Sequence, residues 1–138
     1  MKLGFTGTRE GMSPYQKTEF VRLLTEIQPT EFHHGMCVGA DAEAHELVRR
    51  HLPNTKIIGH RPEKSDLIAK GLLYDDIMTA QPYLTRNRNI VNASDKFIGC
   101  PLGPEIARSG TWQAIRFARK KQKRRPSMEV VVIDRGGQ

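Results

Sequence analysis

The segment EFHHGMCVGADAEAHELVRRH, residues 31–51, places a strand pattern, a glycine turn and a helical pattern in direct succession. Residues 31–38 predict a strand. The turn Gly39-Ala40-Asp41 follows, and Asp41 is expected to cap a helix that runs to about His51. Apolar side chains recur in that helix at spacings of three and four residues, which predicts an inward face of Ala44, Leu47 and Val48.

The same alternation extends on both sides of this segment. Further strands are expected over residues 2–6, 56–59, 96–99 and 129–133. Ser13-Pro14-Tyr15-Gln16 has the pattern of a capped helix start, and two more helices are expected over residues 83–93 and 111–121. The least regular part is residues 62–82, for which we expect a broken helix containing Leu67, Ile68, Leu72 and Leu73.

Strands that alternate with helices predict a three-layer, doubly wound α/β domain. We expect a mostly parallel sheet of about five strands, with the ligand site beyond the carboxyl ends of the strands. The 138 residues fit one domain, residues 1–138. The apolar runs are only a few residues long, and the N-terminal residues lack a secretion signal pattern, so we expect a cytoplasmic protein with no membrane association.

The net charge of +7 comes from residues 116–125, which hold seven of the 22 Lys and Arg residues and no acidic residue. One interpretation is a nucleic-acid surface, because clustered cations bind phosphates. The preferred interpretation is a solvated helix end, since almost no aromatic side chain is interleaved for base stacking. The candidate nucleic-acid contacts are Arg119, Lys120, Lys121, Lys123, Arg124 and Arg125.

Loops rich in Gly, Ser, Thr and Arg follow three of the expected strands. They read Thr6-Gly7-Thr8-Arg9, Gly39-Ala40-Asp41 and Arg108-Ser109-Gly110-Thr111-Trp112. Glycine lets the backbone approach a ligand closely, and a helix N-terminus offers free N–H groups to an anion. We therefore expect a phosphate or nucleotide pocket. The patterns GxxxxGK[ST] and GxGxxG are absent, which disfavours an ATPase or a standard dinucleotide dehydrogenase.

Four motifs in this order resemble the SLOG superfamily: GFTGTR at residues 4–9, GMCVGADAEAH at 35–45, RNRNIV with SD at 86–95, and SGT at 109–111. This superfamily includes the Rossmann-like domain of the DNA-processing protein DprA and the LOG nucleotide hydrolases. The chain most resembles small members with RNR-IV-SD and RSGTW patterns. The resemblance covers nearly the whole chain and implies a SLOG-like Rossmannoid domain.

The LOG hydrolases cleave the N-glycosidic bond between a base and ribose 5′-phosphate. Resemblance to them implies that Ser109-Gly110-Thr111 forms a phosphate turn and that Arg86 is catalytic. The catalytic Glu of that family falls on Ala114 here, so a hydrolase would take its carboxylate from Glu105 or Glu10. The expected ligand-binding residues are Gly7, Thr8, Arg9, Gly39, Asp41, Arg86, Asn87, Ser109, Gly110, Thr111 and Trp112.

Three functions follow in order of preference. The first is binding of a nucleotide or nucleotide-derived phosphorylated ligand by a sensor, carrier or sequestering protein. The second is a nucleotide N-glycosidase that uses Arg86 with Glu105 or Glu10. The third is a DprA-like DNA-binding module.

Most of the remaining candidate residues are expected to have structural roles. His33, His34 and His45 lack a metal-site spacing such as HExxH, so we expect hydrogen-bonded histidines, with no metal and no cofactor. Cys37 is expected to be a small buried residue. Trp112 is expected either to stack on a ring or to pack in the core. Homo-oligomerisation through apolar helix faces is expected, with Ile115 and Phe117 as candidates.

Overall fold

The computed structural model describes residues 1–64 and 66–136. Strands and helices alternate along most of this part of the chain. The strands are β1 (Lys2–Gly7), β2 (Glu31–His34), β3 (Lys56–Pro62), β4 (Asp76–Gln81), β5 (Lys96–Cys100) and β6 (Glu129–Val132). The helices are α1 (Pro14–Ile27), α2 (Ala40–His51), α3 (Tyr83–Ala93) and α4 (Gly110–Arg124).

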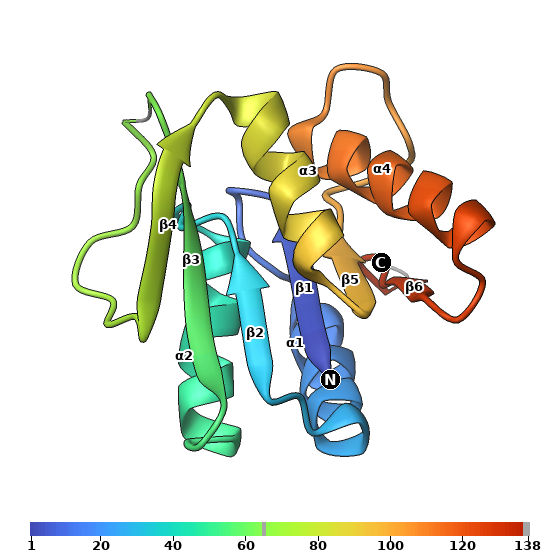
Figure 1. The fold of residues 1–138 in the computed structure, drawn as a ribbon. Helices are drawn as coiled ribbons and strands as arrows, with labels where there is room; N and C mark the ends of the chain where they lie inside the picture. Colours follow the sequence, from blue (N-terminus) through green and yellow to red (C-terminus); the bar gives the residue numbers. More distant parts are fainter. Residues whose placement is uncertain (65, 137–138) are drawn as a thin grey trace.

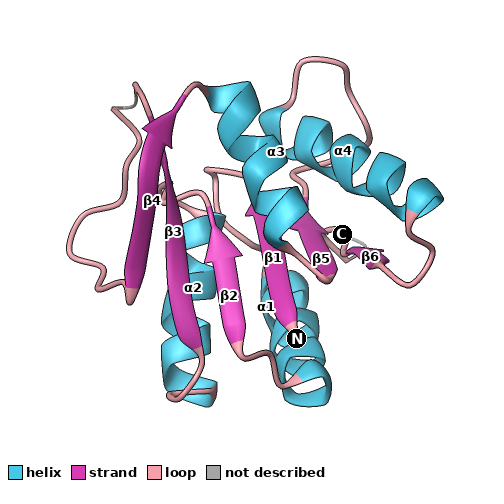
Figure 2. Ribbon diagram, viewed as in Figure 1, coloured by secondary structure: helices cyan, strands magenta, loops and turns pink. Residues whose placement is uncertain are grey.

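The described strands form one six-stranded sheet in the order β4-β3-β2-β1-β5-β6, and every neighbouring pair is parallel. Helices α1 and α2 cover one face of the sheet, and α3 and α4 cover the other (Figure 1 and Figure 2). The predicted three-layer, doubly wound α/β architecture is therefore confirmed, with six strands where about five were expected.

Each face of the sheet packs against its own pair of helices. On the α1/α2 face, Phe5 lies 5.2 Å from Phe20 between ring centroids, and both rings are fully buried beside Phe32. On the α3/α4 face, Phe97 packs with Ile90 and with residues of α4. Burying such side chains contributes about 1.5–3 kcal/mol each, so the two layers hold the strand ends in place.

The segment expected to be a broken helix differs most from the sequence prediction. Residues 76–81 form β4, the edge strand, and residues 67–69 pair with residues 36–38 through Val38 N–H to Leu67 O at 2.7 Å and Ala69 N–H to Met36 O at 2.9 Å. Strand β4 is exposed or half-buried along its length. It therefore has neither the apolar run of a buried strand nor a regular alternation.

Strand β2 and helix α2 also differ in detail from the prediction. The strand ends at His34, and the helix is capped by Gly39, whose φ of 84° suits glycine. Asp41 lies inside the first turn, and its carboxylate accepts the N–H of Cys37 at 3.2 Å. Asp41 therefore fixes the turn between the strand and the helix from within.

Helix α1 begins as its sequence indicates. The hydroxyl of Ser13 accepts the N–H of Gln16 at 3.1 Å, and the Gln16 carboxamide accepts the N–H of Ser13 at 2.9 Å. Among the described residues, no helix is both long and apolar enough to cross a membrane.

Candidate functional site

The strand order reverses at β1, which has β2 on one side and β5 on the other. The loops after β1 and β5 leave the sheet in different directions from this point, and doubly wound folds bind ligands in the crevice between such loops. The N–H of Thr8 donates to the carbonyl of Cys100 at 3.2 Å and so ties the two strand ends together. A cavity of about 680 Å³ opens above them.

The cavity brings together almost all of the residues expected to bind a ligand. Its walls come from the β1–α1 loop, the end of β2, the start of α3 and the β5–α4 loop. The expected residues that line it are Gly7, Thr8, Arg9, Asp41, Arg86, Asn87, Ser109, Gly110, Thr111 and Trp112. This volume is in the range of cofactor and small-molecule sites.

Two expected site residues lie elsewhere. Gly39 does not line the cavity: it packs against the backbone of Arg9, where a side chain would clash. Glu105 is exposed and pairs with Arg116 at 3.0 Å. Of the two carboxylates proposed for catalysis, the structure brings only Glu10 to the cavity wall, where it accepts the hydroxyl of Thr8 at 2.6 Å.

The N-terminus of α4 forms one wall. The hydroxyl of Ser109 accepts the N–H of Trp112 at 3.1 Å. The N–H groups of Gly110 and Thr111 precede this capped residue and have no partner within the helix, because helix geometry provides none at these positions. The first turn holds no acidic side chain. This wall therefore presents backbone donors and a positive dipole end to the cavity.

Arg86 is the cation closest to the interior of the site. The side chain comes from α3, is only 4% exposed, and lines the cavity. Its Nη1 donates to the carbonyl of Gly35, and the ring of Tyr83 lies 4.4 Å from its Cζ. Its Nε has no hydrogen-bond partner among the described residues. A buried donor without a partner is uncommon and points to a missing acceptor.

Asp41 lies close to this arginine. Burial raises the pKa of Asp41 to about 6, while the Arg86 guanidinium and the N–H groups of Cys37 and Gly35 act in the opposite direction. The site thus holds a carboxylate that gains a proton in the mildly acidic range.

Trp112 is part of both the core and the cavity wall. It is 8% exposed, belongs to the core under α3 and α4, and also lines the cavity. Its indole N–H donates to the carbonyl of Gly103 at 3.1 Å. It is the protein's one tryptophan, so its fluorescence reports on the cavity.

Tyr83 and Cys37 also line the cavity and were not expected to. The Tyr83 hydroxyl lies 3.7 Å from the Cys37 Sγ, and burial raises the pKa of both groups. Tyr83 begins the expected helix 83–93, so its place beside Arg86 could be suspected from its helical spacing of three. Nothing in the sequence indicates Cys37.

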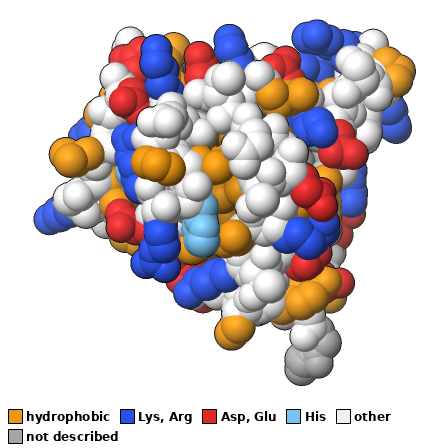
Figure 3. All heavy atoms as spheres, turned by 90° about the horizontal axis from the view of Figure 1, so that it is seen from below, with side chains coloured by type: hydrophobic (Ala, Val, Ile, Leu, Met, Phe, Trp, Pro, Cys, Tyr) orange, Lys and Arg blue, Asp and Glu red, His pale blue; other side chains and the backbone are white. Residues whose placement is uncertain are grey.

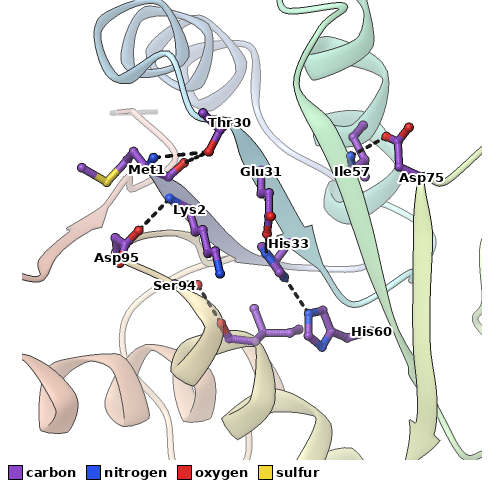
Figure 4. Close-up of polar contacts among 11 residues, drawn as sticks. Met1, Lys2, Thr30, Glu31, His33, Ile57, His60, Asp75, Ser94 and Asp95 are labelled. Carbon is purple, nitrogen blue, oxygen red and sulfur yellow. Dashed lines mark hydrogen bonds and ion pairs between the residues drawn. The ribbon is translucent and has the colours of Figure 1, made fainter.

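The histidines form hydrogen-bonded pairs. Nε2 of His34 lies 2.9 Å from Nδ1 of His45, and Nδ1 of His34 accepts the N–H of Met36. Nδ1 of His33 lies 2.8 Å from Nε2 of His60, between β2 and β3 (Figure 4). Burial lowers the pKa of all four rings. The described residues contain no cluster of three or more metal-ligating side chains.

The basic segment is not a uniform surface. Lys121 is buried, and its ammonium group donates to the carbonyls of Val91, Asn92 and Ser94 at 2.8–3.2 Å. Lys121 therefore caps the C-terminal end of α3 and, being buried, is not available to contact a nucleic acid as expected. The other five residues of that set are exposed: Arg119, Lys120, Lys123, Arg124 and Arg125.

Seen from the amino ends of the strands, Lys and Arg side chains gather at one corner, on the side where α4 ends (Figure 3). Elsewhere on this face, acidic and basic side chains are interspersed (Figure 3). Ile115, an expected oligomer contact, is fully buried in the core, and Phe117 is half-buried beneath the guanidinium of Arg88 at 4.9 Å. Ile115 is thus not available to a second chain.

Comparisons with known proteins support the fold. No protein-family model and no curated protein matches the chain. A molybdenum cofactor binding protein from the phototrophic bacterium Rippkaea orientalis is similar in structure, with a TM-score of 0.69 and 23% identity, over 96% of this chain and 76% of that chain. The structural genomics target TM1055 has a TM-score of 0.59 and 17% identity, over 87% of this chain and 69% of that chain. The chain therefore shares its Rossmann-like fold with these two proteins.

Proposed function

We propose that the cavity binds a nucleotide or a nucleotide-derived ligand through a phosphate group, and that the protein acts as a sensor, carrier or sequestering protein. The observation that carries this proposal is the buried guanidinium of Arg86: the residue lines the cavity, and its Nε has no hydrogen-bond partner among the described residues. A phosphate oxygen is a suitable acceptor for it, because charge-assisted hydrogen bonds to phosphate are strong. The free N–H groups of Gly110 and Thr111 supply further donors on the α4 wall.

The rest of the cavity suits the organic part of such a ligand. Apolar and aromatic side chains alternate with a few polar groups, as in most small-molecule sites. Trp112 offers a ring surface, and Leu102 and Ile106 of the β5–α4 loop add apolar surface. Arg9 and Arg108 are exposed on the two loops and extend the positive charge of the site.

Titration of the protein with AMP, GMP and orthophosphate, followed by Trp112 fluorescence and calorimetry, tests this proposal. Adenosine is the control ligand without a phosphate. The molybdenum cofactor belongs in the same panel, because the structural neighbour from Rippkaea orientalis is described as binding it. We expect Arg86→Gln to weaken phosphate-dependent binding at least about tenfold, since a hydrogen bond to a charged group contributes about 1.5–3 kcal/mol. Arg50→Gln changes an exposed cation on α2 and is the matched control.

A second candidate is hydrolysis of the N-glycosidic bond of a nucleotide. It is favoured by Glu10 and Asp41, two carboxylates that line the same cavity as Arg86. A carboxylate stabilises the positive charge that develops on the sugar. Chromatography for free base after incubation with nucleoside monophosphates tests this reaction. Release of free base that disappears in Asp41→Asn or Glu10→Gln supports this reaction. Nucleotide binding without release of free base supports the binding function only.

A further inference from the structure

Tyr83 lies close to both of the groups proposed to bind the anion, the guanidinium of Arg86 and the N-terminus of α4. Its ring centroid lies 4.4 Å from Cζ of Arg86. On the other side, its Cε1 lies 3.6 Å from the position that a Cβ would take at Gly110, the first residue of α4. The phenol ring therefore fills the gap between the buried guanidinium and the N-terminus of α4.

The polar contacts of the Tyr83 side chain are weak. Tyr83 is 43% exposed and is the first residue of α3, whose N-cap Pro82 makes no side-chain cap. Its hydroxyl lies 3.7 Å from the sulfur of Cys37, a weak hydrogen-bonding partner. Stacking on Arg86 is its main favourable contact with a charged group, and such stacking is worth a factor of about 2 to 30 in an equilibrium constant.

We propose that Tyr83 controls access of the phosphate to Arg86: its ring takes the place of the anion in the empty cavity and rotates away when the anion binds. This inference rests on the proposed function. With the ring in place, one phosphate cannot contact both the guanidinium and the first N–H groups of α4. Displacement of the ring joins these two groups into one site.

The energetic consequence is a lower apparent affinity in the natural protein. The apparent affinity of a site that is open for only a fraction of the time equals the affinity of the open site multiplied by that fraction. The fraction is set by the stacking of Tyr83 on Arg86. Removing the ring should therefore tighten anion binding, whereas removing a ring that stacks on the ligand would weaken binding.

Orthophosphate is the decisive probe, because it has no ring that could stack on Tyr83. We expect Tyr83→Ala to bind orthophosphate about 2- to 30-fold more tightly than the natural protein, measured by Trp112 fluorescence. The gain should vanish in the double variant Tyr83→Ala/Arg86→Gln, and Tyr83→Phe, which keeps the ring, should show no gain. Tyr15→Ala is the matched control, since Tyr15 is also an exposed tyrosine in the first turn of a helix, at 48% exposure, and lies outside the cavity.

A second measurement uses the unaltered protein and so does not depend on how a variant folds. The Tyr83 hydroxyl lies 3.7 Å from the Cys37 Sγ, so we expect rotation of the ring to uncover Cys37, whereas Cys100 is fully buried. Saturating orthophosphate should raise the rate at which iodoacetamide modifies Cys37 at least twofold. An unchanged or slower rate contradicts the inference, as does Tyr83→Ala that binds orthophosphate equally or more weakly.

Failure of this inference differs from failure of the proposed function. If nucleotides bind in an Arg86-dependent manner but Tyr83→Ala brings no gain for orthophosphate, only the role of Tyr83 falls. If orthophosphate, AMP and GMP bind to neither the natural protein nor Tyr83→Ala, the proposed function falls together with it.

Discussion

At the scale of single residues, Lys121 shows how a cation in a basic segment stabilises the fold. Its ammonium group donates to three carbonyls at the end of α3, so it replaces the hydrogen bonds that a helix end lacks. We expect Lys121→Met to lower the free energy of unfolding by about 1–3 kcal/mol in urea titrations, because these carbonyls lose a charged donor. The neighbouring Lys120→Met, at an exposed position, should change it by no more than about 0.5 kcal/mol. Equal effects of the two substitutions would contradict this role.

The buried histidines make stability depend on pH. Burial lowers the pKa of His60 from 6.5 to about 4 and lowers those of His33, His34 and His45. As the pH falls, these histidines therefore take up protons in the unfolded chain before they do so in the folded protein. The free energy of unfolding that is present above pH 6.5 is lost as the pH falls toward 4. Between pH 7.5 and pH 5, His60 alone should reduce the free energy of unfolding by about 2 kcal/mol. Denaturant titrations at the two pH values measure this loss, and equal stability at both would refute it.

Asp41 acts in the opposite direction. Its pKa is raised from 3.8 to about 6, so its folded state takes up a proton before its unfolded state does. Its stabilising contribution is therefore complete below pH 3.8 and is lost as the pH rises through 6. We expect Asp41→Asn to steepen the loss between pH 7.5 and pH 5 by about 1 kcal/mol. The same titrations on this variant check the expectation, and a shallower loss would show that Asp41 titrates elsewhere.

At the scale of elements, the buried Gln16 joins the start of α1 to the ends of two strands. Its Nε2 donates to the carbonyls of Pro101 and Ile133 at 3.0 and 2.8 Å, beyond β5 and β6. Gln16→Leu should destabilise the protein by about 2–4 kcal/mol, because it leaves these carbonyls and the Ser13 N–H without partners. Thr18→Ala, at an exposed position of the same helix, is the control, and thermal unfolding measures both. An unaltered melting temperature for Gln16→Leu would show that the contact contributes little.

Elements with strong local signals could be predicted from the sequence. The bounds of α3 agree with the expected helix 83–93, and Ser13 and Gln16 cap the start of α1 as their sequence pattern predicts. Strand β4 could not be predicted, because its pairing with β3 at the sheet edge, and not its own residues, makes it a strand. On α3, the expected site residues Arg86 and Asn87 are buried and line the cavity, whereas the apolar Leu84 is 47% exposed.

At the scale of the whole molecule, the alternation of strands and helices was enough to predict where the cavity lies. Parallel strands place their following loops at one edge of the sheet, so residues 7–9 and 108–112 meet although about 100 positions separate them. Contacts that depend on side-chain packing were beyond the sequence. Two examples are the stacking of the Tyr83 ring on Arg86 and the ion pair between Glu105 and Arg116.

We propose above all that the cavity at the β1/β5 switch point holds a phosphate between Arg86 and the N-terminus of α4. A crystal structure of the protein with a bound nucleoside monophosphate tests it most directly. We expect phosphate oxygens within hydrogen-bond distance of Nε of Arg86 and of the N–H groups of Gly110 or Thr111, with the Tyr83 ring turned away. A nucleotide bound outside this cavity, or one whose phosphate contacts neither Arg86 nor α4, would contradict the proposed phosphate site.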